Sequence, residues 1–206
     1  MKKFKLLLLF LVFLFSQKVS AAVYDPKLEW KTITTAHFHI HYYPGEEKVV
    51  QKLVPMVEEV YDELTKRWDC YPWARTEVVV TDNYDQANGL TDIIPYNTIV
   101  LRVVPPTADS SLADVDDWMR GLFAHEFTHV LHLTDTRYPA KLAKLLFGNI
   151  VAPNGLTPGW VIEGLPTYFE TKEGHGGRGQ ASYTEMLLRT DILNHQFLKI
   201  DEMAGS

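Results

Sequence analysis

A change of hydrophobic period near residue 107 restricts the fold of this 206-residue chain more than any other feature. Before it, β-branched and aromatic residues are concentrated in strand-like segments at residues 30–43, 76–81 and 97–104. After it, apolar residues recur every three or four positions, as in helices, at residues 118–134, 139–147, 160–171 and 181–195. We therefore predict an α+β protein. A small lobe with a mixed or antiparallel sheet, residues 22–106, precedes a helical lobe, residues 107–206.

Three local signals refine the first lobe. Residues 46–68 have the pattern of an amphipathic helix, which Pro55 is expected to bend. Asn88-Gly89 is a dipeptide typical of turns. We expect the strand at residues 97–104 to lie at an edge of the sheet, where an extended peptide could add as a further strand.

The first 21 residues have the composition of a secretory signal peptide. Lys2, Lys3 and Lys5 precede an unbroken apolar run at residues 6–15, and small residues end the segment. This run is too short for a bilayer span, which needs about 20 residues. We therefore expect an exported protein, periplasmic or secreted, with no membrane span after cleavage.

Cleavage would leave an acidic chain. The signal peptide carries four lysines and no acid, so the mature chain has 16 Lys and Arg against 26 Asp and Glu, a formal net charge of −10. Nucleic-acid binding depends on cations that meet phosphates, so no nucleic-acid partner is expected. Cys70 is the only cysteine, which excludes an internal disulfide, and we expect a buried thiol.

Three histidines alternate within the first strand-like segment. His37, His39 and His41 would share one face of a strand and could bind a metal ion. The segment contains no carboxylate that would make such a site catalytic. We interpret these histidines as a half-exposed strand face.

The segment HEFTH, residues 125–129, carries the clearest chemical signal. On a helix, residues four apart point in nearly the same direction, so His125 and His129 can reach one metal ion. Glu126 is offset by one residue and can take a proton from water beside the metal without binding it. This spacing therefore favours zinc-dependent hydrolysis.

A catalytic zinc site needs a third protein ligand, and two residues compete for that role. Glu163 opens a second predicted helix, which could pack against the first. Asp135 follows His129 by six residues, a spacing used by enzymes that have a glycine at the third step. His132 occupies that step here and resists the required turn. We therefore favour Glu163.

The two segments HEFTH (residues 125–129) and PGWVIEGLPTYFE (residues 158–170) resemble the peptidase MA-like gluzincin metalloproteases. Those families combine H-E-x-x-H with W-x-x-E-G-x-A-x-Y-x-E. The W-x-T-I-x-T-x-H-F-x-I-x-Y pattern from Trp30, residues 87–89 and Gly177-Arg178 support the resemblance. Together, most of residues 28–205 resemble the N-terminal peptidase-like region of large exported bacterial proteins that end in a TolB-like β-propeller.

The resemblance implies a zincin-like fold with a zinc ion, Zn2+, on His125, His129 and Glu163, and with Glu126 as the general base. Glu170, seven residues after Glu163, matches a carboxylate that holds a ligand histidine in its metal-binding tautomer. The family usually has alanine where this chain has Pro166. The expected partners are a peptide or protein substrate and a C-terminal β-propeller. Because this chain has no propeller segment, we expect it to be truncated at its C-terminus.

The sequence thus predicts an exported zinc metallopeptidase. The alternative is a catalytically inactive domain that keeps the fold and acts as a binding or assembly module. A carbohydrate hydrolase would need two carboxylates at a defined separation, and no feature of the sequence singles out such a pair.

Overall fold

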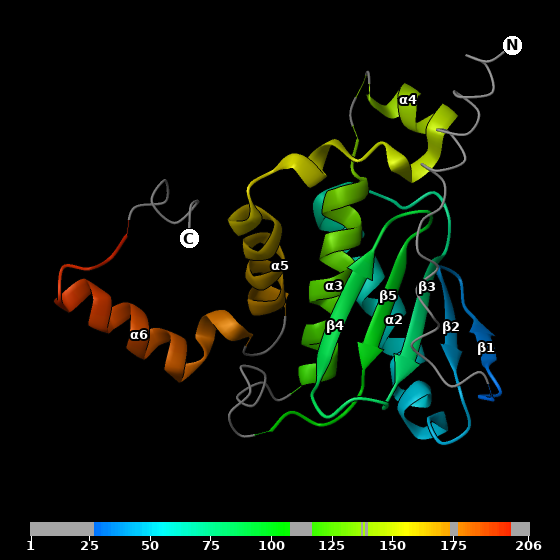
Figure 1. The fold of residues 1–206 in the computed structure, drawn as a ribbon, viewed down its shortest axis with the longest axis horizontal. Helices are drawn as coiled ribbons and strands as arrows, with labels where there is room; N and C mark the ends of the chain where they lie inside the picture. The colour runs from blue at the N-terminus through cyan, green and yellow to red at the C-terminus, as the bar shows by residue number, and fades with distance from the viewer. Residues whose placement is uncertain (1–26, 108–116, 137, 139, 174–176, 199–206) are drawn as a thin grey trace, which may run out of the picture.

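The computed structural model describes residues 27–107, 117–136, 138, 140–173 and 177–198 (Figure 1). The expected signal peptide at residues 1–21 lies outside the described residues. Within them, five α-helices accompany one five-stranded mixed sheet, which confirms the predicted α+β class. None of the helices in the described part of the chain has both the length and the apolar character needed to cross a bilayer.

The sheet has the strand order β1-β2-β3-β5-β4. The three central strands are parallel, and each edge strand is antiparallel to its neighbour. This arrangement confirms the mixed sheet that the sequence of residues 22–106 predicts. The strands are β1 (Lys31–Thr34), β2 (Phe38–Tyr42), β3 (Thr76–Thr81), β4 (Asn88–Asp92) and β5 (Thr98–Arg102).

The single strand predicted for residues 30–43 is in fact a hairpin. The amide of Thr35 donates to the carbonyl of Phe38 over 2.9 Å, which closes a turn between β1 and β2. His37 belongs to this turn, so only His39 and His41 lie on the strand. The alternation of β2 holds, because Phe38 and Ile40 are fully buried whereas both strand histidines are partly exposed.

Two expectations about the other end of the sheet are wrong. Asn88-Gly89 does not form a turn but begins β4, because pairing with β5 overrides the local preference of the dipeptide. The strand predicted at residues 97–104, β5, lies between β3 and β4 rather than at an edge. The strand that leaves one side unpaired here is therefore β4.

The structure confirms the helix predicted near residues 46–68 and the four helices predicted after residue 107. They are α2 (Glu47–Trp68), α3 (Trp118–Thr134), α4 (Ala140–Phe147), α5 (Gly159–Glu173) and α6 (Ser182–Leu193). Three short 3-10 turns join them, at Gly148–Ile150, Pro153–Leu156 and Arg178–Gln180. In Figure 1, α2 and α3 cover one face of the sheet, α5 lies beside α3, and α6 extends away from the body.

One apolar core joins the sheet to α2 and α3. Alternate residues of β2, β3 and β5 point into it, and α2 adds residues at helical spacing. Three phenylalanine rings meet at its centre with centroids 5.4 to 5.9 Å apart: Phe38, Phe123 and Phe127. The core therefore fixes α3, and with it the histidines of residues 125–129, against the sheet.

Candidate metal centre

Helix α3 is enclosed on all sides, although a helix at a protein surface would show one polar face. It contacts α2, α5 and β4, and residues 121–132 are all buried. Asp117 caps its start, with a side chain that accepts from the amide of Arg120 over 3.2 Å. His125, Glu126 and His129 are thus polar groups largely withdrawn from solvent, where each needs a partner.

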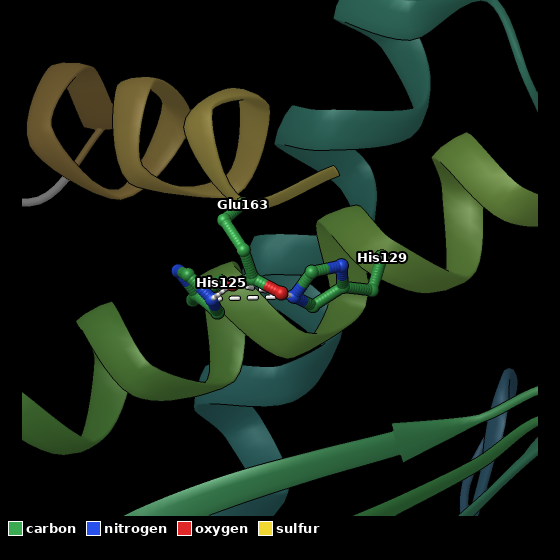
Figure 2. Close-up of side chains that lie close together, drawn as sticks. All are labelled: His125, His129 and Glu163. Atoms are coloured by element: carbon green, nitrogen blue, oxygen red, sulfur yellow. Dashed lines mark hydrogen bonds and ion pairs between the residues drawn. The ribbon is translucent and has the colours of Figure 1, made fainter. Parts of the chain in front are cut away.

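The structure brings His125, His129 and Glu163 together (Figure 2). The two imidazoles project from α3 towards α5, which supplies Glu163 from its second turn. The Nε2 atoms of the histidines are 3.2 Å apart. Oε2 of Glu163 lies 3.7 Å from each of them. Among the described residues this is the group of donors that could hold a metal ion.

These distances fit a small tetrahedral ion. Zinc bonds of about 2.0–2.1 Å at tetrahedral angles separate the ligand atoms by about 3.3–3.4 Å, close to the distances found here. Glu163 is the exposed member, with 69% of its side chain accessible, so the site opens to solvent on the α5 side. Asp135, the competing ligand, ends α3 and is absent from the group.

Glu126 lies against the edge strand of the sheet. The hydroxyl of Thr91 in β4 is 2.7 Å from Oε2 of Glu126 and donates to it. A Cβ atom on Gly89 would lie 2.3 Å from Oε1, so only glycine leaves room for the carboxylate. Burial raises the pKa of Glu126, and the hydrogen bond from Thr91 opposes that rise. Sequence reasoning missed both β4 residues because it assigned this segment to a turn.

Glu170 approaches His125 from the side opposite the metal donors. Its Oε2 lies 2.9 Å from Nδ1 of His125, as the resemblance implies. When Nδ1 donates to Glu170, Nε2 keeps its lone pair for a metal. The carboxylate is almost fully buried at 2% exposure. Burial alone would raise its pKa, but hydrogen bonds from Arg178 and His125 hold the pKa of Glu170 below its usual value.

Arg178 is a residue of this site that sequence reasoning did not assign a role. Its Nε donates to Oε1 of Glu170 over 2.7 Å and its Nη2 donates to Oε2 over 2.8 Å. Nη2 is also 2.6 Å from Nδ1 of His125, so Arg178 and Glu170 compete for this nitrogen: Nδ1 donates to Glu170 in the metal-binding tautomer and accepts from Arg178 in the other tautomer. Arg178 follows Gly177, where an added Cβ would lie 2.6 Å from the backbone of Thr171. The close packing of Gly177 on α5 places the guanidinium.

The electrostatic surroundings of His129 favour its neutral imidazole, the form that binds metals. Burial and, second, the neighbouring His125 lower the pKa of His129 to about 4. A cleft of about 350 Å³ opens over the donors. Its lining includes Glu126 and Arg178 together with the exposed edge of β4. A ligand could therefore reach the donors and Glu126 from the same side.

The other histidines in the described part of the chain do not join this group. His37 contacts Glu58 of α2, with Nδ1 2.6 Å from Oε2. His39 and His41 both contact Glu77 of β3, at 3.0 and 2.6 Å. His132 is buried beside Trp68, and its Nδ1 has no hydrogen-bond partner. The partly exposed face predicted for β2 thus pairs with a carboxylate from the adjacent strand, which a sequence pattern cannot place.

Comparison with known proteins leaves the family open. No protein-family model matches the chain, and no curated protein matches it. The fold and the donor group therefore define an α+β protein with a site that could hold a metal ion.

Proposed function

We propose that this chain is an exported zinc-dependent metallopeptidase with a zincin-like fold. One observation carries the proposal: the buried Glu126 and the donors of His125, His129 and Glu163 line the same cleft. The donor set of two imidazoles and one carboxylate suits zinc in a catalytic site, because it leaves a fourth position for water or substrate.

When bound, zinc supplies Lewis-acid chemistry, which polarises a carbonyl oxygen and makes a water molecule more acidic. Glu126 accepts a proton from the attacking water and later delivers it to the leaving amine. Its raised pKa suits both halves of that exchange. Thr91 and Gly89 orient the carboxylate from β4, and Glu170 orients His125 from α5.

The position of β4 supports a peptide substrate. This antiparallel edge strand borders the cleft, and Asn88, Gly89 and Thr91 all line it. An extended peptide beside β4 could pair with the outer backbone groups of the strand, taking the place of the Asn88 side chain at the amide of Gly89. Such pairing would hold a scissile peptide bond next to Glu126.

The test compares the zinc content and the peptide hydrolysis of three variants with those of the unmodified chain. Glu126→Gln should keep zinc, measured by mass spectrometry, and lower the hydrolysis of quenched peptides by at least about 100-fold. Glu163→Ala should lower both the zinc content and the hydrolysis. Glu185→Gln serves as the matched control, because Glu185 is an exposed acid on α6.

The outcomes separate the candidate functions. If the purified protein holds no zinc and Glu163→Ala changes nothing, the metal site is wrong. If the protein holds zinc without hydrolysing any peptide, the inactive binding module replaces the peptidase.

A further inference from the structure

Helix α4 has its apolar side on the outside. Ala140, Ala143 and Lys144 face the protein, whereas Leu142, Leu145 and Leu146 form an outward stripe at helical spacing. Leu145 is 64% exposed and Leu146 is 72% exposed. A surface helix of a water-soluble domain normally buries this side. The sequence predicts the helix but cannot predict that it is inverted.

The inversion is held in place by contacts beneath the helix. Nζ of Lys144 donates to the carbonyl of Thr134, at the C-terminal end of α3, over 2.7 Å. A surface helix usually turns such a side chain towards water, but here Lys144 holds α4 to the end of α3. Burial lowers the pKa of Lys144. The leucine stripe cannot turn inward without breaking this contact.

Exposed apolar side chains continue to the end of α4 and beyond it. Phe147, the last residue of α4, is exposed, as is Ile150, and Leu156 is 91% exposed. In Figure 1, α4 and the two 3-10 turns that follow it form one end of the molecule, beyond the C-terminal end of α3. Exposed large apolar side chains gathered at one end of a molecule are typical of a site of interaction.

The charge of this segment indicates what it meets. Residues 136–162 contain no Asp or Glu, in a chain whose formal net charge is −6. Lys144 is used beneath α4, and the exposed cation of the helix is Lys141. A cation beside exposed leucine and phenylalanine matches a lipid surface with anionic headgroups, which attracts cations and accepts apolar side chains. Aliphatic side chains dominate the outward stripe, and a lipid surface accepts them without matching polar groups.

We propose that the segment from α4 to Leu156, the docking segment, inserts its apolar side chains into the surface of an anionic lipid bilayer. The inferred contact lies in the plane of the headgroups and does not cross the bilayer. It is independent of the proposed peptidase activity, because none of its residues lines the metal cleft.

Vesicle flotation tests this inference with a chain that begins at Ala22. That chain keeps every described element and lacks the apolar run of residues 6–15, which would bind lipid by itself. The vesicles contain phosphatidylcholine either alone or mixed with phosphatidylglycerol. The unmodified chain should float with the mixed vesicles and bind less to phosphatidylcholine alone.

Two double variants locate the contact. Leu145→Glu with Leu146→Glu should lower the partition onto mixed vesicles by at least about tenfold. Ile192→Glu with Leu193→Glu adds the same charge to α6, where these residues are 57% and 73% exposed, and should change the partition less than about twofold. Circular dichroism verifies that both variants fold.

Three outcomes would overturn the inference. The unmodified chain could fail to bind either kind of vesicle. The α6 variant could lose as much binding as the α4 variant, which would show unspecific adsorption. Light scattering could show a dimer that only the α4 variant dissociates, in which case a second copy of the chain covers the docking segment.

Discussion

Gly89 limits what can stand beside Glu126. Its amide hydrogen is held by the side chain of Asn88, and its Cα faces the carboxylate with no room for a Cβ. A single added methyl group must therefore push Glu126 away from its position next to the metal donors.

Gly89→Ala should keep zinc but lower peptide hydrolysis by about 100-fold, because displacements of about 1 Å at a catalytic group have effects of this size. Gly155→Ala is the matched control, since a Cβ there meets nothing within 4 Å. Parallel zinc analysis and peptide assays check the prediction. Full activity of the Gly89 variant would mean that Glu126 can act from another position.

Glu170 offers a second prediction for a single residue. Glu170→Gln keeps the size of the side chain but removes the charge that favours the metal-binding tautomer of His125. Zinc affinity should fall by about 10- to 100-fold, as measured by competition with a chelating dye. Equal affinities would remove Glu170 from the site and leave its contact with Arg178 as a structural ion pair.

At the scale of elements, the start of α2 meets the end of β3 through two carboxyl groups. Glu46, which precedes α2, is only 5% exposed. Burial first, and then the negative charge of Asp82, raises the pKa of Glu46 from 4.5 to about 7. The folded state therefore binds this proton more tightly than the unfolded state does.

The sign of the pH effect follows from that difference. The stabilisation from protonated Glu46 is complete below about pH 4.5 and is lost as the pH rises towards about 7. Glu46→Gln should consequently raise the free energy of unfolding at pH 8, by about 2 kcal/mol, and have little effect at pH 4. Urea denaturation at both pH values measures the difference. Glu47→Gln is the control with the opposite sign, because hydrogen bonds from the backbone of Gly45 lower the pKa of Glu47.

The local sequence pattern predicted those elements whose formation depends mainly on the residues within them. Helix α3 begins and ends at the predicted residues, because its period and its apolar content agree. Strand β4 was missed because a turn-forming Asn-Gly pair starts it. What makes it a strand is pairing with β5, a contact that the sequence does not encode locally.

Some residues of the candidate site could also be predicted from local spacing, and others could not. Helical spacing predicted that His125 and His129 share a face, and the need for a third ligand favoured Glu163. The resemblance to a family suggested Glu170. Arg178 could not be found by spacing, because it reaches Glu170 from a 3-10 turn beyond the end of α5. The outward leucines of α4 also escaped prediction, since a hydrophobic period gives a stripe but not its direction.

At the scale of the whole molecule, the metal donors join two helices that are far apart in the sequence. A bound ion would connect α3 to α5, and ions that bind only the folded state stabilise it by mass action. Zinc at about 100 times its dissociation constant should add about 2.7 kcal/mol and raise Tm by about 5–10 °C.

A chelator should reverse this rise in Tm, and Glu163→Ala should abolish most of it. Differential scanning calorimetry with and without zinc makes the measurement. A rise in Tm that survives Glu163→Ala would place the stabilising ion elsewhere, for example at the histidines around Glu77.

The single thiol has a consequence for the conditions in which the molecule can work. Cys70 is half-buried near the carbonyl of Leu131, and burial raises the pKa of its thiol to about 11. Only roughly one molecule in ten thousand would then carry the reactive thiolate at neutral pH. In an oxidising compartment almost no thiolate would be present to be oxidised. In a reducing compartment the chain has no internal disulfide that could be reduced. The integrity of the fold should therefore be indifferent to redox potential.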